Sequence, residues 1–444
     1  MSMVSVTIVG AGSHFTMGLL GDFFRVGLED ARLVLMDIDE ARLKTIYRVV
    51  RKVLEKRKFN LKVEACTDLR NAIEGADYVI TTIRTGGTEG LKSYIEIPLK
   101  YNAVHIVGDT TGPGCVFKAL LEAPSIISVA EAVKDLSPNA MLLNFTNPMT
   151  TLCMTAYMAT GVRTVGLCHG INHIINLASK LLNIDPNTLE PVAAGINHFT
   201  WTTGVFYKKE NLLPKLYSEL FNPDKYEIVK NHPYLIGRQL FKVFKVAPTL
   251  SDRHTCEFFH QLYTWINHPE IGSILKKCSG YVDFERRKLL ETVLERTEEW
   301  YREMKEIEVG KRDVVPHKEF ALDIISAIEN GKTEFLPAVN IPNNGLLKEL
   351  PDKVFVEVPG IVSKSGVHSL RVELPSSVLA LLNLHSTKFV LLAKGIVEKD
   401  LTLIEEALNL DPLTPSPELG HKMLNEFIKC WKKHLEQYGF KITI

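Results

Sequence analysis

The first half of the chain alternates short apolar runs with longer segments of helical spacing. Apolar runs that predict strands occupy residues 4–12, 31–39, 61–68, 77–87, 140–149 and 162–168. Apolar positions at helical spacing occupy residues 15–26, 40–59, 69–76, 117–138 and 154–161. This regular order of strand and helix predicts an α/β fold with a doubly wound parallel sheet.

The pattern changes after about residue 190, where segments become longer, more helical and more irregular. Residues 282–312 form a charged pattern typical of a helix with a solvated face. Residues 336–362 carry Pro and Asn-Gly turns between short strands, and residues 376–410 are mostly apolar helix. We therefore predict two tightly joined domains: residues 1–190, and an α+β domain over residues 191–444.

Composition narrows the class of protein. Apolar residues make up 45% and charged residues 23% of 444, as in ordinary globular chains. Lys+Arg and Asp+Glu both number 52, so the chain lacks the basic excess of a nucleic-acid binder. We expect neither a signal peptide before the first strand nor a membrane span. The seven cysteines are widely scattered, which argues against a disulfide framework and favours a cytoplasmic location.

A glycine-rich turn follows the first predicted strand. Gly10, Gly12 and Gly18 are spaced more widely than the standard dinucleotide fingerprint, and such a turn alone could be structural. The context favours nucleotide binding, because a helix follows and Asp37 ends the next strand. A pyrophosphate would lie at the helix N-terminus. Asp37 would accept hydrogen bonds from a ribose and repel a 2′-phosphate, so NAD is expected rather than NADP.

Polar residues follow several of the predicted strands. Arg84, Asp109, Asn147 and the pair Cys168-His169 stand where strands or their connections should end. In open parallel sheets, ligands bind beyond the carboxyl ends of the strands, so these groups could converge on one pocket. Each also has a structural explanation, such as a turn at Asn147 or a helix cap at Asp109.

Two segments of the second half add further polar groups. Asn197 and His198 follow a short apolar run, and Cys168 with His198 could bind Mn²⁺, Fe²⁺, Co²⁺ or Zn²⁺; simple packing of both side chains is the alternative. Asp252, Arg253 and Glu257 lie close together in the chain. A helical Arg253–Glu257 ion pair and a cluster near a sugar or carboxylate are both open.

Five motifs together resemble one enzyme family. They are TIVGAGS, NFTNP, GLCHG, GINHFTW and VNIPNNG with VFVEVPGIV, and they run in order from residue 4 to about residue 415. This combination resembles the NAD- and divalent-metal-dependent glycosidases of glycoside hydrolase family 4. The resemblance implies a Rossmann-like fold related to lactate and malate dehydrogenases. It also implies an NAD-binding first domain, and a second domain for substrate binding and oligomerisation.

The resemblance implies a chemistry of elimination and addition. NAD⁺ removes hydride from C3 of the sugar, and a divalent metal, Mn²⁺ being expected, polarises the resulting carbonyl. A base then removes the C2 proton, the C1–O bond breaks, water adds, and the hydride returns.

The matching positions suggest roles for individual residues. The base is expected at Asp252, because no Tyr stands in residues 245–260, and the leaving-group acid at His169, with Asp109 as the alternative. The remaining expected roles are cofactor binding by Gly10, Gly12, Ser13, Asp37 and Arg84, metal binding by Cys168 and His198, and substrate binding by Asn147, Asn197 and Arg253.

The substrate is suggested by the residues that follow the metal cysteine. Cys-His-Gly accompanies α-glucuronidases in this family, and Gly170 would leave room for a C6 carboxylate that Arg253 or Arg84 could bind. An α-D-glucuronide is therefore expected, with an α-galacturonide, an α-glucoside or a 6-phospho-glycoside as alternatives. Family members are commonly dimers or tetramers, so a homodimer or homotetramer is expected. A 2-hydroxy acid dehydrogenase or a non-enzymatic NAD sensor would explain the nucleotide fold, but would not need Cys168 together with His198.

Overall fold

The core of the protein is the predicted parallel sheet. The computed structural model describes residues 3–279 and 289–442. Six parallel strands stand in the order β3-β2-β1-β4-β5-β6, which is the order of a doubly wound nucleotide-binding fold. The predicted fold class is thereby confirmed. The strands are β1 (Ser5–Val9), β2 (Ala31–Met36), β3 (Leu61–Cys66), β4 (Tyr78–Thr81), β5 (Met141–Asn144) and β6 (Thr164–Gly166).

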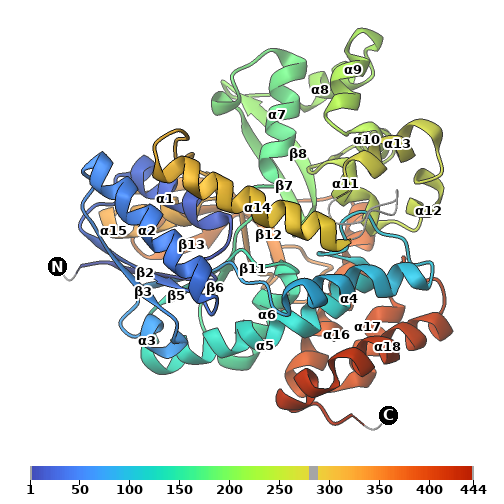
Figure 1. Ribbon diagram of the computed structural model, residues 1–444. Coiled ribbons are helices and arrows are strands. Elements are labelled where there is room, and N and C mark those ends of the chain that lie inside the picture. Colours follow the sequence, from blue (N-terminus) through green and yellow to red (C-terminus); the bar gives the residue numbers. More distant parts are fainter. Residues whose placement is uncertain (1–2, 280–288, 443–444) are drawn as a thin grey trace.

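Helices cover both faces of this sheet (Figure 1). Side chains alternate along each strand: Val6 and Ile8 enter the core under one helical layer, whereas Thr7 donates to the Ala72 carbonyl on the opposite face. The first layer contains α1 (Phe15–Val26), α2 (Glu40–Arg57), α14 (Leu289–Glu308) and α15 (Ala321–Asn330). The second contains α3 (Leu69–Ile73), α4 (Gly87–Lys100), α5 (Gly112–Leu136), α6 (Met149–Thr160), α17 (Leu401–Asn409) and α18 (Pro417–Gln437).

The sheet does not stop at β6. Asn340 of β11 (Glu334–Pro342) pairs antiparallel with Gly166 of β6, and β12 (Phe355–Ser363) follows. The sheet then continues through β7 (Glu190–Ile196), β8 (Phe199–Tyr207) and β10 (Ala247–Pro248). One sheet therefore runs through both halves of the chain. The predicted boundary at residues 190/191 falls at the start of β7 and stays a prediction.

The strands β7 and β8 carry a separate group of helices, which forms the upper part of the molecule in Figure 1. Aromatic packing supports it: the rings of Phe199 and Phe258 stack with centroids 4.3 Å apart, and Trp201 is fully buried. The helices are α7 (Ile171–Leu182), α8 (Leu213–Leu220), α9 (Tyr226–Asn231), α10 (Leu235–Phe244), α11 (Asp252–Thr255), α12 (Leu262–Trp265) and α13 (Pro269–Lys277).

Several boundaries differ from those expected. The strand expected over residues 77–87 ends at Thr81, and a left-handed Gly86 at φ 77° is the N-cap that precedes α4. The charged helix expected from residue 282 is described from Leu289 onward, and residues 280–288 lie outside the described part.

Helix α16 (Ser376–Glu398) is long and apolar enough, by length and composition, to cross a membrane, which the sequence analysis did not expect. Half of its most apolar window is buried inside the protein, as in a core helix. The helix also carries Lys388, which is fully buried and paired with Asp411.

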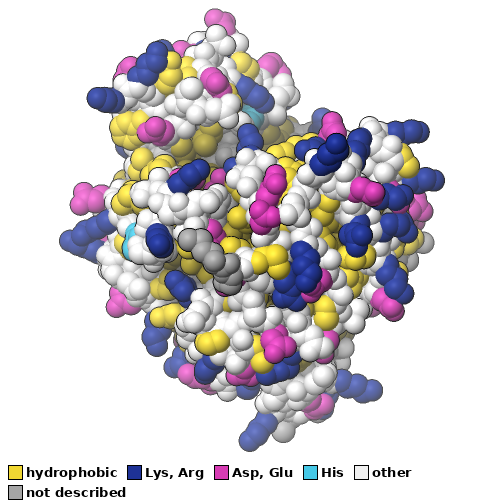
Figure 2. Space-filling view, turned by 90° about the vertical axis from the view of Figure 1, so that its left-hand side faces the viewer, with side chains coloured by type: hydrophobic (Ala, Val, Ile, Leu, Met, Phe, Trp, Pro, Cys, Tyr) yellow, Lys and Arg dark blue, Asp and Glu magenta, His cyan; other side chains and the backbone are white. Residues whose placement is uncertain are grey.

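The charged side chains on the molecular surface are mixed in sign. On the face in Figure 2, basic and acidic side chains are interspersed, consistent with the formal net charge of zero.

Candidate active site

The glycine turn after β1 lies tightly against two other segments. Gly10 has φ 88°, and a Cβ added to it would lie 2.6 Å from the Thr82 carbonyl oxygen. A Cβ at Gly18 would lie 2.1 Å from the His317 ring, so the third glycine of the motif allows α1 to pack closely against His317. The Ser13 hydroxyl bonds to that of Thr82 at 3.0 Å, which ties the turn to the end of β4. These glycines therefore let the turn and α1 pack directly against the end of β4 and against His317.

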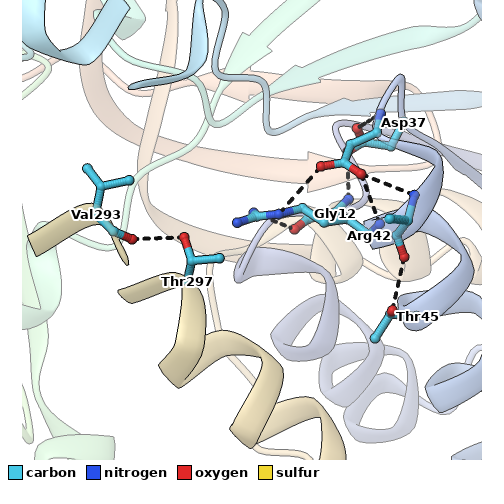
Figure 3. Close-up of polar contacts among 8 residues, drawn as sticks. Gly12, Asp37, Arg42, Thr45, Val293 and Thr297 are labelled. Atoms are coloured by element: carbon cyan, nitrogen blue, oxygen red, sulfur yellow. Dashed lines mark hydrogen bonds and ion pairs between the residues drawn. The ribbon is translucent and has the colours of Figure 1, made fainter. Parts of the chain in front are cut away.

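Asp37, the residue after β2, accepts hydrogen bonds that fix the glycine turn. Its Oδ2 accepts the Gly12 amide at 2.7 Å, and its Oδ1 accepts the Asp39 amide at 2.8 Å. Arg42 of α2 donates to the Gly12 carbonyl at 3.3 Å, and its guanidinium lies 5.0 Å from the centre of the Trp300 ring of α14. Figure 3 shows Gly12, Asp37 and Arg42 in this corner, beside α14 with Val293 and Thr297. Sequence reasoning missed Arg42, because its contacts with Gly12 and Trp300 join segments that are far apart in the chain.

Cys168 and His198 come from different halves of the chain and lie in the same region. Cys168 follows β6, is 6% exposed, and its Sγ accepts the Gly170 amide at 3.3 Å. The Asn197 side chain reaches the Cys168 thiol, and His198 is the next residue, at φ 65° in the turn from β7 to β8. Burial, with Glu357 nearby, raises the pKa of the thiol. Within residues 3–279 and 289–442, no three His, Cys, Asp or Glu side chains form a metal-binding group, so this pair would need ligands from substrate or water.

The His198 ring is connected to Asp109 through Thr110. The Thr110 hydroxyl lies 2.7 Å from His198 Nδ1 and donates to Asp109 Oδ1 at 3.1 Å. Lys118 Nζ lies 3.9 Å from the Asp109 carboxylate, and the His254 ring centroid is 4.5 Å from that of His198.

These neighbours set the charge states of the pair. Burial alone would raise the pKa of Asp109, but Lys118, His198 and His254 outweigh it and lower this pKa to about 2. Burial lowers the pKa of His198 to about 4, against the opposing effect of Asp109. At neutral pH, Asp109 is therefore a carboxylate and His198 a neutral imidazole, the form that binds metals.

Buried charges hold the segment that carries Asp109. Glu257 Oε1 accepts three successive amides, of Ile106, Val107 and Gly108, at 2.7, 2.8 and 3.0 Å. The ion pair that the sequence left open between Arg253 and Glu257 therefore does not form. At the other end, Asp411 Oδ2 accepts the Gly112 amide at 2.9 Å, and Lys388 donates to Thr111 at 2.6 Å.

A second buried carboxylate, missed in the sequence analysis, lies beside Cys168. Glu357 of β12 is 1% exposed, and its Oε2 accepts from the side chains of Asn197 and Asn340 at 2.9 and 3.0 Å. Burial raises its pKa. Within the described residues, Glu357 Oε1 and the side-chain oxygens of both asparagines have no donor. These oxygens could accept from sugar hydroxyls or water.

The neighbouring residues Asp252 and Arg253 have different surroundings. Both Asp252 oxygens are engaged by the first turn of α10, accepting the amides of Ile236 and Gly237 at 2.9 and 2.8 Å. Burial raises the pKa of Asp252 to about 7. Arg253 lies near His198 and His254, and its buried Nε has no hydrogen-bond partner in the described part of the chain.

His169 has an exposed side chain, whereas Gly170 is packed against Leu250. His169 Nδ1 lies 2.7 Å from Glu319 Oε1, a contact that raises the pKa of His169, and its side chain is 61% exposed. A Cβ on Gly170 would lie 3.1 Å from Leu250, so the space that glycine leaves is filled by Leu250 rather than open to a carboxylate. The expected carboxylate space at Gly170 is therefore not found. His173 stacks on His232 at 4.3 Å, a packing role.

The remaining expected residues lie at the strand ends. Asn147 precedes a cis peptide bond to Pro148, and its buried Oδ1 lacks a donor among residues that the structure describes. Arg84 follows β4 and is exposed, just before α4.

The "Family 4 glycosyl hydrolase" profile matches residues 5–184, and the profile of the family's C-terminal domain matches residues 193–414. The chain belongs to glycosyl hydrolase family 4. The resemblance expected from the sequence motifs is thereby confirmed, and the protein is a glycoside hydrolase rather than a hydroxy acid dehydrogenase.

Several family 4 proteins are similar over nearly the whole chain. An α-galactosidase of Rhizobium meliloti (strain 1021) is 28% identical over 100% of this chain and 91% of its own length. An α-galacturonidase of Thermoanaerobacterium saccharolyticum is also 28% identical, over 99% and 97% respectively. A solved 6-phospho-α-glucosidase from gut microorganisms, in complex with NAD and Mn²⁺, has a TM-score of 0.78 at 22% identity, covering 97% of this chain and 98% of that one.

A similar fold is also found outside the family. A malate dehydrogenase from Plasmodium falciparum has a TM-score of 0.51 at 12% identity, covering 90% of this chain and 100% of that one. This likeness concerns the fold alone and agrees with the dehydrogenase-like architecture expected from the sequence.

Proposed function

We propose that this family 4 protein is an NAD- and Mn²⁺-dependent α-glycosidase that cleaves glycosides of hexuronic acids, with α-D-glucuronides as the first candidates. The observation that carries the proposal is the Asp109–Thr110–His198 contact, with Cys168, which follows β6, beside Asn197. NAD and Mn²⁺ occur in the related 6-phospho-α-glucosidase structure.

The residues present fit both groups. The Gly10–Gly12 turn and the α1 N-terminus offer backbone amides to a pyrophosphate, and Asp37 keeps lone pairs for a ribose. Cys168 and the neutral His198 are soft and borderline ligands that a first-row transition metal accepts better than Mg²⁺ does, and the harder Mn²⁺ would take its remaining ligands from substrate and water oxygens. When bound, NAD supplies reversible oxidation at C3 of the sugar, and the metal stabilises negative charge on its oxygen.

Three residues are candidates for proton transfer. Asp252, whose pKa burial raises to about 7, is matched in basicity to proton removal at C2, as the sequence predicts. Asp109 is ionised at neutral pH and 24% exposed, so it is the more accessible carboxylate, but with a pKa of about 2 it is the weaker base. Asp252 is 1% exposed and caps α10 with both oxygens, so its base role would require α10 to release it. His169, protonated more readily through Glu319, is suited to donate to the leaving group.

A cation beside the metal pair supports recognition of a uronic acid. Arg253 lies close enough to His198 to affect its pKa, and the Arg253 Nε is buried without a partner in the described residues. A guanidinium binds a carboxylate through two parallel hydrogen bonds. Asn147 and Asn197, whose side-chain oxygens lack donors among described residues, would accept from sugar hydroxyls.

An α-galacturonidase is the second candidate. The related α-galacturonidase of Thermoanaerobacterium saccharolyticum has the same 28% identity to this chain as the α-galactosidase. Both acids carry the same C6 carboxylate and differ in the orientation of the C4 hydroxyl, so Arg253 would serve either.

The test is a panel of p-nitrophenyl α- and β-glycosides, covering glucuronides, galacturonides, glucosides, galactosides and phosphoglucosides. It is run with NAD⁺, Mn²⁺ and a thiol reductant. We expect turnover of an α-uronide that stops on addition of EDTA or on Cys168→Ser, without net consumption of NAD⁺. Turnover of a neutral or phosphorylated glycoside with none of any uronide would contradict the proposed substrate. Undiminished activity of Cys168→Ser would contradict the metal pair.

A further inference from the structure

Thr110 lies between the Asp109 carboxylate and the His198 ring. Its hydroxyl is 3.1 Å from Asp109 Oδ1 and 2.7 Å from His198 Nδ1, and the residue is 3% exposed. A threonine hydroxyl has one proton to donate, whereas a carboxylate can only accept. With the Thr110 proton directed to Asp109, the hydroxyl oxygen can only accept from His198, so Nδ1 carries the hydrogen. The lone pair of this imidazole is then on Nε2.

We propose that Thr110 is a positioning residue that fixes His198 in its Nδ1–H tautomer and so presents Nε2 to a divalent metal. The inference rests on the proposed function, because it takes His198 as a metal ligand. Metal-binding histidines almost always donate their second ring N–H to a fixed acceptor, which sets the tautomer and the ring orientation. Thr110 supplies that acceptor here, and Asp109 in turn orients Thr110.

The surroundings keep Thr110 in this place. The amides just before it bind the Glu257 carboxylate, and the Gly112 amide just after it binds Asp411. Thr110 also has a branched Cβ, which restricts rotation of its side chain. The His254 ring, 4.5 Å away, packs against the His198 ring and limits its rotation. Both partners of the hydrogen bond are therefore held before any metal arrives.

A titration of Mn²⁺ into the purified full-length protein, followed by isothermal calorimetry or by the EPR signal of free Mn²⁺, tests this role. Thr110→Val keeps the shape but removes the hydroxyl, and we expect the Kd for Mn²⁺ to rise about 10–100-fold. Thr110→Ser restores the hydroxyl and should bring the Kd back to within about 3-fold of wild type. A purely packing role would not predict this rescue.

Thr200→Val is the matched control. Thr200 is 2% exposed, stands two positions after His198, and its hydroxyl has no partner in the described part of the chain. The same substitution there should leave the Kd unchanged. Thermal unfolding in EDTA checks that each variant is folded, and Thr110→Ala replaces the valine variant if the latter does not fold.

The outcomes separate this inference from the proposed function. If wild type binds Mn²⁺ and loses it on Cys168→Ser, but Thr110→Val and Thr110→Ala bind normally, the role of Thr110 is wrong and the metal pair stands. If wild type itself binds no Mn²⁺, the metal pair is wrong, and the role of Thr110 is rejected with it.

Discussion

Lys388 and Asp411 form an ion pair that is sealed from solvent, with Nζ and Oδ2 2.6 Å apart and side chains 1% and 0% exposed. The same oxygen of Asp411 accepts the Gly112 amide, and the same ammonium donates to Thr111. The pair therefore joins α16 and the segment after α17 to the turn that leads into α5. That turn carries Asp109 and Thr110, so the stability of a distant helix is coupled to the site.

Removing one member of this pair should be costly. Lys388→Met leaves Asp411 buried without its cation, and we expect the free energy of unfolding to fall by about 3–5 kcal/mol. Urea denaturation followed by circular dichroism measures it. Lys388→Met with Asp411→Asn also removes the unpaired charge and should recover part of the loss. An equal free energy of unfolding for wild type and Lys388→Met would contradict the prediction that the ion pair stabilises the fold.

The coenzyme preference is expected to depend on Asp37. Asp37→Ser removes the acceptor for a ribose and the negative charge that repels a 2′-phosphate. Hydrogen bonds to a charged group contribute about 1.5–3 kcal/mol, so the Kd for NAD should rise at least about 10-fold, while that for NADP changes less. Calorimetric titration with both coenzymes measures the ratio. Asp39→Ser is the control, because Asp39 caps α2 through Ala41 and Arg42. A matching loss in that control would mean that damage to α2, rather than loss of a ribose contact, is responsible.

Substrate selectivity should depend on Arg253. Arg253→Gln removes the cation proposed to bind the C6 carboxylate, so kcat/KM for an α-uronide should fall about 10–100-fold. The value for the matching neutral glycoside should change little, which a merely structural defect would not produce. Arg238→Gln is a suitable control, since Arg238 stacks on Tyr226 at 4.9 Å. Parallel losses on both substrates in Arg253→Gln would exclude carboxylate recognition.

The dependence of stability on pH should include a contribution from Glu257. Burial raises its pKa from 4.5 to about 7, so between these values the folded protein holds a proton that the unfolded chain has released. Stability from this group is present at low pH and is lost as pH rises toward 7, by up to about 1.4 kcal/mol per pH unit. Glu257→Gln resembles the protonated form and should remove this slope. Urea denaturation at pH 5, 6, 7 and 8 compares the two proteins, and parallel curves would mean that Glu257 is ionised throughout.

The parallel half of the fold was predictable because its signals are local. The strand of residues 4–12 and the helix of residues 15–26 follow from the period of their apolar positions, and Gly10 from the turn between them. The insertion of β11 and β12 between β6 and β7 was not predictable. It depends on pairing Asn340 with Gly166 and Glu357 with Gly195, far apart in the chain.

For the candidate site, too, the sequence predicted residues that stand in local motifs and missed residues whose partners are distant in the chain. Cys168, His198 and Asn197 were recognised from motifs, but Glu357, Glu319 and Thr110 were not singled out, because their roles depend on partners brought by other elements. For Glu257 the sequence left two interpretations open, a helical ion pair with Arg253 and a loop cluster near a sugar or carboxylate. Helix α11 ends at Thr255, and the change of backbone geometry turns Glu257 toward the amides of residues 106–108.

The sheet that continues from β6 into β11 has a consequence for how the protein can be divided. A fragment that stops near residue 190 would lack β11 and expose β6 as an unpaired edge, open to pairing with other chains. The C-terminal fragment would in turn lack the strand against which β11 is aligned. Expressed apart, the two pieces should aggregate or require co-expression, so the Gly10 turn and the proposed metal pair are expected to form only when both halves fold together.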